Sequence, residues 1–220
     1  MPAGGTGIGF APGYDAANHY LGVSYTAGNP QNDGAHAYTW DPNWGSALSI
    51  DSTTLVYDAM GRTVEQQNGT TFTEVMYGPT GKLALMNGQT EIQSFEPLPG
   101  GGTFVHRPGS LTNYWRHPNW LGSSGLATTL PGRIKFYDGA YAPFGEDYNG
   151  TGTKDLSFTG QTQDTTTTVG GLYDFTFREY APRQGRWISP DPAGLGAVTM
   201  ENPQTWNRYA YVGNTPLAAT

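Results

Sequence analysis

Cysteine is absent from this sequence of 220 residues, and only 13% of the residues are charged. Without cysteine, the chain has no disulfide, no thiolate nucleophile and no cysteine-ligated zinc site. Lysine is so scarce, at three residues, that a coiled coil or a helical bundle is excluded. No apolar run approaches the roughly 18 residues of a membrane-spanning helix, so we expect no membrane span.

Positive charge is also scarce. Eleven Lys and Arg residues face 18 Asp and Glu residues, which gives a formal net charge of −7. A nucleic-acid-binding protein needs clustered basic side chains, so we expect no nucleic-acid partner. The four histidines have no helical or alternate-strand spacing, so we expect no metal site. Nothing in the sequence indicates a cofactor.

Turn formers and aromatic residues are abundant. The chain has 32 Gly and 16 Pro, together with 14 Tyr, 9 Phe and 6 Trp. Aromatic and β-branched residues favour strands, and Gly, Pro, Asn and Asp favour the turns between them. The aromatic side chains supply apolar area to bury, which excludes a fully disordered chain. We therefore predict an all-β fold with many short strands.

A repeat of about twenty residues occupies the middle of the chain. Tyr57–Arg62 reads YDAMGR and Tyr77–Lys82 reads YGPTGK, with Asn68–Gly69 and Asn87–Gly88 between strand-like runs. An Asn-Gly pair in this context predicts a hairpin with a type I′ turn, in which both central residues have positive φ. The repeat unit is thus predicted to be strand, turn, strand, turn.

Two groups of motifs carry a family resemblance. Tyr57, Asp58, Gly61 and Arg62 resemble the tyrosine–aspartate (YD) repeat of the Rhs superfamily. Short motifs in the second half are similar, in the same order, to the Rhs repeat-associated core domain: His117–Ser123, Tyr141–Gly145, Phe158–Gln161, Gly171–Phe175, Arg178–Pro182, Gly185–Pro192 and Asn207–Asn214. Each motif is weak alone, but the ordered set spans roughly residues 35–220 and is specific.

The resemblance implies an architecture and a role. YD hairpins wind into a spiralling or barrel-like antiparallel sheet, which the core domain caps. On this basis we expect an N-terminal segment, 1–96, with YD-type repeats and an Rhs core, 97–220, in one continuous β-structure. The family includes bacterial polymorphic toxins, the shell component of Tc toxins and, more distantly, teneurins. Its shells enclose a C-terminal toxin, so we expect a structural shell or cap module without that toxin.

The family releases its toxin by an aspartyl self-cleavage that uses two Asp-Pro-x-Gly elements. The first maps onto Asp191, Pro192, Ala193 and Gly194, and the second is expected just beyond residue 220. A carboxylate dyad works because two like charges share one proton, so a single aspartate leaves the dyad incomplete. We therefore expect no autonomous catalysis, unless another carboxylate substitutes; the candidates are Asp155, Asp164 and Asp174.

Two alternatives remain open at this stage. The first is a hydrolase that uses Asp191 with another carboxylate, or Ser123 as nucleophile with His117 as base across a loop. The second is a carbohydrate- or protein-binding module that uses the aromatic-rich stretch 114–144. For that stretch, a buried β-layer is favoured over an exposed site. Four arginines stand beside aromatic residues and are expected to stack on rings and to pair with carboxylates such as Glu179; they are Arg116, Arg178, Arg186 and Arg208.

The ends of the sequence lead to two further expectations. The first seven residues have neither the basic nor the apolar region of a signal peptide, so we expect a bacterial protein that is cytoplasmic or exported without such a signal. A spiralling sheet that is cut at both ends has unpaired backbone groups at its edges. Those edges predict self-association, unless they are closed or covered.

Overall fold

The computed structural model describes residues 12–109, 112–152, 156–163 and 171–218. In these ranges the chain forms three antiparallel sheets and four 3₁₀ helices of three or four residues each. The largest sheet has twelve strands, and each strand pairs with the next along the chain. The all-β prediction is therefore confirmed.

The twelve-stranded sheet, called the wall below, consists of β3 (Tyr38–Trp40), β4 (Ala47–Ile50), β5 (Thr53–Tyr57), β6 (Thr63–Asn68), β7 (Thr71–Gly78), β8 (Gly81–Asn87), β9 (Thr90–Pro97), β10 (Thr103–His106), β11 (Tyr114–Pro118), β12 (Ser124–Thr129), β13 (Lys135–Tyr141) and β14 (Asp147–Gly152). The ladder continues from β9 to β10 across residues 96 and 97. Ahead of the wall, β1 (Tyr25–Thr26) and β2 (Asn29–Pro30) form a small hairpin.

Residues 156–163 and 171–218 follow the wall and are called the plug below. Their short elements are η1 (Phe158–Gly160), β15 (Thr162–Gln163), β16 (Tyr173–Asp174), β17 (Glu179–Ala181), β18 (Arg186–Trp187), η2 (Gly194–Ala197), η3 (Pro203–Trp206) and η4 (Tyr211–Asn214). The four strands form their own antiparallel sheet.

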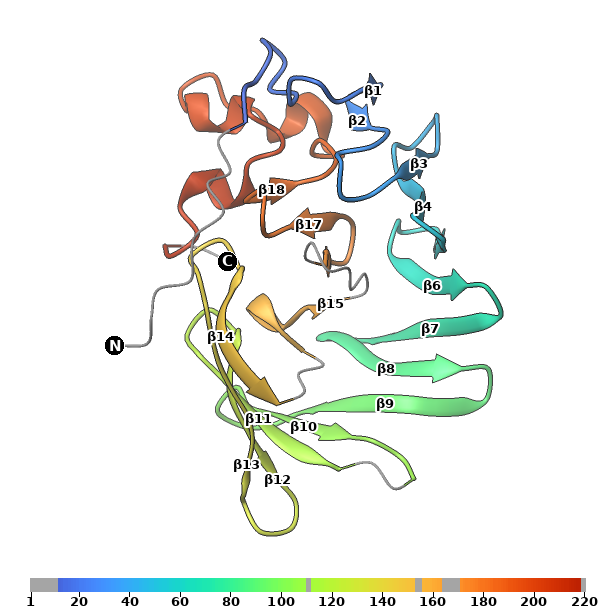
Figure 1. Cartoon of the computed structure of the whole chain (residues 1–220), viewed down its shortest axis with the longest axis vertical. Coiled ribbons are helices and arrows are strands. Elements are labelled where there is room, and N and C mark those ends of the chain that lie inside the picture. The colour runs from blue at the N-terminus through green and yellow to red at the C-terminus, as the bar shows by residue number, and fades with distance from the viewer. Residues whose placement is uncertain (1–11, 110–111, 153–155, 164–170, 219–220) are drawn as a thin grey trace.

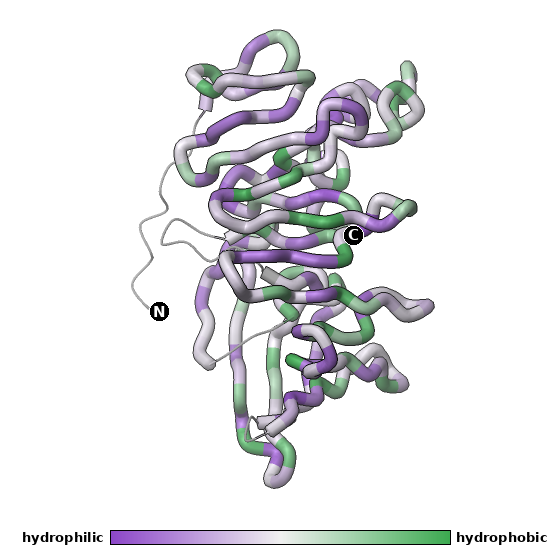
Figure 2. The backbone as a smooth tube through the Cα atoms, turned by 90° about the vertical axis from the view of Figure 1, so that its right-hand side faces the viewer, coloured by the Kyte–Doolittle hydropathy of each residue, from purple (hydrophilic) through white to green (hydrophobic). Residues whose placement is uncertain are grey.

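The wall is strongly curved, and the strands of the plug lie inside the curve (Figure 1). Seen from the side, successive wall strands follow one another as stacked rungs (Figure 2). Register shifts interrupt many of the strand pairs, for example at Val56/Tyr57, Met76/Tyr77 and His117/Pro118. Such bulges bend a strand and increase its twist, which accounts for the curvature.

Buried side chains join the inner face of the wall to the plug. One cluster packs Ile50 and Leu55 of the wall against Leu172 and Ile188 of the plug. A second cluster packs wall residues against Leu156; its buried wall members are Phe95, Val105, Tyr114, Ala127 and Tyr137. Burying one large apolar side chain contributes roughly 1.5–3 kcal/mol, so these clusters make the plug part of the core.

A third cluster, inside the plug, is almost wholly aromatic. Its buried members are Phe158, Tyr173, Tyr180 and Tyr211. The rings of Tyr180 and Tyr211 have centroids 4.4 Å apart, and the Tyr180 hydroxyl donates a hydrogen bond to the carbonyl of Phe144. The aromatic-rich composition thus serves the core, as Tyr114 and Tyr137 of the 114–144 stretch also do.

The two Asn-Gly hairpins form, but the predicted turn type is wrong. Asn68 pairs with Thr71, so the loop residues are Gly69 and Thr70, and of these only Gly69 has positive φ (60°). The second hairpin is built in the same way: Asn87 pairs with Thr90, so Gly88, with φ of 58°, is the first of its two loop residues. Glycine at the first central position is the pattern of a type II′ turn. Asn68 stays in its strand, where its side-chain amide donates to Thr53 Oγ1 at 3.3 Å.

In the described part of the chain, no helix has the length and apolar character required to cross a membrane.

Candidate functional site

The YD motif forms a self-contained turn between β5 and β6. Asp58 Oδ1 accepts the backbone N–H groups of Met60 and Arg62, both at 2.9 Å, and Arg62 Nε donates to Asp58 Oδ2 at 2.8 Å. The pKa of Asp58 lies below its usual value, chiefly because its carboxylate accepts a hydrogen bond from the backbone N–H of Arg62. The side chain of Arg62 lowers this pKa further. Gly61 has φ of 78°, which glycine adopts without strain. The motif residues thus have a structural role in this turn.

The corresponding turn of the second repeat is built differently. Gly78 stands where the first repeat has Asp58, and the loop shortens so that Gly78 pairs with Gly81. Lys82 has no aspartate in its own turn. Its ammonium instead forms an ion pair with the carboxylate of Asp174 in the plug and donates to Thr162 Oγ1 at 2.7 Å.

This ion pair between Lys82 and Asp174 is deeply buried. The two side chains are 10% and 1% exposed. Glu179, which lies opposite Asp174 in the β16–β17 register, is 5% exposed. Removing one partner of such a pair leaves the other charge uncompensated in the interior. The ion pair is therefore a buried polar link between wall and plug, and sequence analysis missed it.

Asp191 occupies a turn that resembles the YD turn. Its Oδ1 accepts the backbone N–H of Ala193 at 2.9 Å, and the N–H of Gly194, which has φ of 60°, donates to the Asp191 carbonyl. Pro192 occupies the second position of the turn, where no backbone N–H group is required, so proline is tolerated there. Asp191 Oδ2 accepts a hydrogen bond from Arg178 Nη2 at 3.1 Å.

Arg178 fixes the Asp191 carboxylate from inside the plug. Its guanidinium lies 4.1 Å from the centroid of the Trp187 ring, which confirms the expected stacking. Burial lowers the pKa of Arg178, and Asp191 opposes that shift. Of the possible second carboxylates, Asp174 is bound to Lys82, while Asp155 and Asp164 lie outside the described residues. The geometry thus gives Asp191 a cationic partner, and its catalytic role stays a prediction.

The structure does not bring His117 and Ser123 together. His117 is exposed on β11, and its Nε2 lies 3.1 Å from Thr128 Oγ1. Ser123 is 1% exposed, and its Oγ accepts the backbone N–H of Thr159 at 2.9 Å. A nucleophile and its base must be within hydrogen-bond reach, and no hydrogen bond joins this pair within the described ranges. No observation therefore favours a Ser–His hydrolase.

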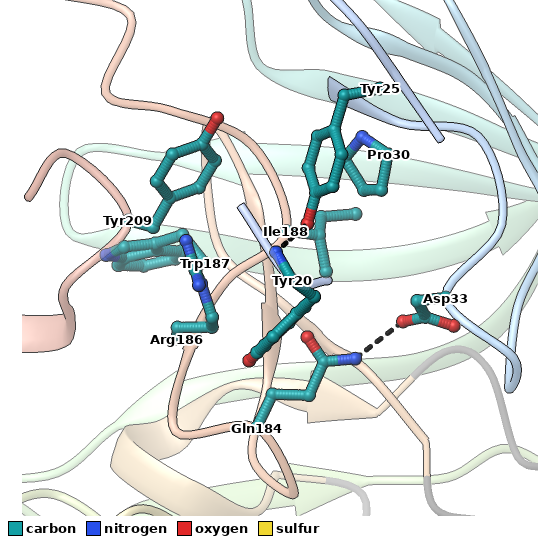
Figure 3. A pocket seen from close by; sticks show the side chains of 9 residues that line it. All are labelled: Tyr20, Tyr25, Pro30, Asp33, Gln184, Arg186, Trp187, Ile188 and Tyr209. Atoms are coloured by element: carbon teal, nitrogen blue, oxygen red, sulfur yellow. Dashed lines mark hydrogen bonds between the residues drawn. The ribbon is translucent and has the colours of Figure 1, made fainter. Parts of the chain in front are cut away.

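Arg186 lies in an aromatic cage that joins the plug to the segment ahead of the wall (Figure 3). Its guanidinium carbon lies 4.3 Å from the Tyr209 ring centroid and 4.7 Å from that of Tyr20. Arg186 Nη2 also donates to the carbonyl of Asn18 at 2.9 Å. Burial raises the pKa of Tyr209 to about 12. The expectation that Arg186 stacks on rings is confirmed.

The cavity beside this cage is too small for a substrate. Its volume is about 10 Å³, which is room for roughly one water molecule. Across it, Gln184 Nε2 donates to Asp33 Oδ2 at 2.6 Å, and the Tyr20 N–H donates to the Tyr25 hydroxyl at 3.2 Å (Figure 3). These contacts hold the segment before the wall against the plug. Within the described ranges, no three His, Asp or Glu side chains are grouped so that they would hold a metal ion.

Comparisons with known proteins point to toxin subunits. No protein-family model matches the chain. A stretch of 113 residues, 48% of the chain, is 34% identical to the toxin subunit YenC2 of Yersinia entomophaga, and 110 residues are 31% identical to the toxin subunit YenC1 of the same organism. Each match covers 10% of the relative's length. The chain is therefore homologous, over about half its length, to small parts of these toxin subunits.

Solved structures share the fold over most of the chain. A crystal structure of TcdB2-TccC3-TEV matches 86% of the chain with a TM-score of 0.62 and 21% sequence identity. A Photorhabdus luminescens Tc holotoxin pore with a mutated TccC3 matches 88% of it with a TM-score of 0.62 and 19% identity. The chain covers 10% of each of those two chains. The curved wall and its plug are thus an architecture that occurs in toxin complexes.

Proposed function

We propose that this chain is a structural module of a toxin-complex shell of the Rhs type, without catalytic activity of its own. It supplies a section of curved β-wall together with the plug that fills the concave side of that wall. The observation that carries the proposal is the packing of the plug residues Leu156, Leu172 and Ile188 into clusters with wall residues. The homology to toxin subunits supports the same role.

The absence of self-cleavage in this module is part of the proposal. These 220 residues contain a single Asp-Pro-x-Gly element, at Asp191. The carboxylate there is held by Arg178 and by the N–H of Ala193, contacts that stabilise a turn. A general acid and base pair needs two titratable groups with separated pKa values. We therefore expect Asp191 to fix the shape of the plug.

Mass spectrometry and a substrate panel test this function together. The purified chain is incubated at 37 °C and its intact mass is followed, in parallel with assays on chromogenic esters, glycosides and phosphoesters. We expect a constant mass and no turnover for the wild type, Asp191→Asn and His117→Ala. A cleavage product that Asp191→Asn abolishes, or turnover that either substitution abolishes, would show an active site and overturn the proposal.

Self-association through a sheet edge is a second part of the proposal. Strand β14 ends the wall, all six of its residues are exposed, and it pairs only with β13 among the described strands. An exposed edge strand is a template for a strand of another chain, and a lysine placed on it blocks such pairing. We propose that this edge joins the module to its neighbour in a shell.

Light scattering after size-exclusion chromatography measures this association. The wild type is expected to exceed the monomer mass as its concentration rises, and Thr151→Lys, on β14, is expected to reduce that excess. Thr54→Lys is the matched control, because Thr54 is exposed on β5, a strand that is paired on both sides, with β4 and β6. A wild type that stays monomeric at every concentration, or equal effects of both lysines, would contradict a role of this edge.

A further inference from the structure

A groove of about 590 Å³ is lined by residues of the wall strands and of their loops, and none of its lining residues belongs to the plug. Its rim is formed on one side by the β9–β10 turn, Leu98–Gly102, and elsewhere by Arg133 of the β12–β13 loop. Its lining also includes residues of the strands β11 and β12. A groove of this volume is in the range of sites that take small ligands, roughly 300–1,000 Å³.

Strand alternation places the groove's side chains on the outer face of β11. Tyr114 and Arg116 are buried, 2% and 5% exposed, and belong to the inner face. Trp115 and His117 therefore point outward, since successive strand residues face opposite sides. Thr128 lies opposite Trp115 in the β11–β12 register, and its Oγ1 lies 3.1 Å from His117 Nε2. One face thus presents an indole ring, an imidazole and a hydroxyl group together.

The charge of the groove is opposite to that of the chain. Arg133 is exposed and has no ion pair within the described ranges. No aspartate or glutamate is among the lining residues, although the whole chain has a net charge of −7. The guanidinium of Arg116 is turned away, to the carbonyl of Gly122 and the hydroxyl of Ser124. Arg133 is therefore the fixed cation of this surface.

These side chains match the chemistry of one ligand class. A half-buried tryptophan offers a rigid apolar face on which a sugar ring stacks. A guanidinium binds a carboxylate through two parallel hydrogen bonds. His117 and Thr128 are hydrogen-bonding partners for sugar hydroxyls. We propose that this groove, formed by Trp115, His117, Thr128 and Arg133, binds an acidic saccharide whose ring stacks on Trp115 and whose carboxylate pairs with Arg133.

Titration calorimetry with trigalacturonic acid tests the proposal, with the neutral galactose trimer and inorganic phosphate as comparison ligands. We expect the acidic trimer to bind the wild-type chain more tightly than either comparison ligand. Trp115→Ala and Arg133→Gln should each weaken its binding roughly tenfold, as the loss of one ring contact or one charge-assisted pair does. Of the two variants, Arg133→Gln is expected to disturb folding less, because the Arg133 side chain is exposed.

Two matched controls separate the groove from general surface effects. Trp120 is 71% exposed and Lys135 has a side chain 60% exposed, and neither lines the groove. Trp120→Ala and Lys135→Gln should leave the affinity for the acidic trimer unchanged. Three outcomes would overturn the proposal: no binding at millimolar concentration, equal binding of the acidic and the neutral trimer, or affinity that both groove variants retain.

Discussion

The two repeats of the wall use related turn sequences in opposite ways. In the first, Asp58 and Arg62 satisfy each other inside one turn, with side chains 22% and 29% exposed. In the second, Gly78 replaces the aspartate, and Lys82 crosses to Asp174, 92 residues further along the chain. Loss of the local carboxylate thus coincides with a long-range ion pair. One motif shapes a hairpin, whereas its variant fastens the wall to the plug.

The difference is also one of solvent exposure. The Asp58–Arg62 pair is partly in water, where side-chain ion pairs contribute little. The Lys82–Asp174 pair lies in the core interface, with exposed fractions of 10% and 1%. There, an unpaired charge is costly, so the two repeats should respond unequally to equivalent substitutions.

The largest expected effect is that of Lys82→Met. The substitution leaves Asp174 buried without its cation, and we expect the free energy of unfolding to fall by about 3–5 kcal/mol. Urea unfolding followed by tryptophan fluorescence measures the change. Arg62→Met is the matched control in the first repeat, and its loss should be clearly smaller. Equal losses for the two variants would contradict the comparison.

A double variant sharpens this result. In Lys82→Met with Asp174→Asn, neither charge remains in the interface. Because most of the cost of the single variant comes from the uncompensated carboxylate, the double variant should recover part of the lost stability. A double variant that is less stable than Lys82→Met would show that the carboxylate is not the source of the cost.

A smaller effect is expected in the backbone of the first turn. Gly61 has φ of 78°. The methyl group of an alanine at this position would make only an ordinary contact, at 3.9 Å, with the side chain of Phe177. Gly61→Ala should therefore cost about 1–2 kcal/mol through backbone strain alone. Gly196→Ala is the control, because Gly196 has open space around it and no positive φ. Thermal unfolding compares the two; an equal melting temperature for both would contradict the strain.

The smallest expected effect is a pH dependence of the stability that Asp58 contributes. Hydrogen bonds, first of all from the Arg62 N–H, hold the pKa of Asp58 below 3.8 in the folded chain. The ionised carboxylate therefore adds stability above pH 3.8, and this contribution is lost as the pH falls through the folded pKa. The stability difference between the wild type and Asp58→Asn should shrink below pH 3.8. An unchanged difference in urea unfolding at acidic pH would contradict this assignment.

Local features could be predicted from the sequence, and long-range ones could not. The Asn-Gly pairs and Gly61 specify hairpins through contacts within a few residues, so their positions were predictable. The aromatic core of the plug was partly predictable from composition. The pairing of Lys82 with Asp174, and of Arg186 with the Asn18 carbonyl, joins segments 92 and 168 residues apart. Periodicity carries no information about such contacts, and only the replacement of Asp58 by Gly78 marked Lys82 as unusual.

Hydrogen exchange, measured by mass spectrometry on the wild type and on Lys82→Met, tests the central claim most directly. If wall and plug form one module, the substitution should reduce the protection of β7 and β8 together with that of β16 and β17. Protection in the distant strand pair β12–β13 should fall less. Loss of protection in the plug alone, with β7 and β8 unchanged, would contradict the account, because the wall would then be stable without its plug.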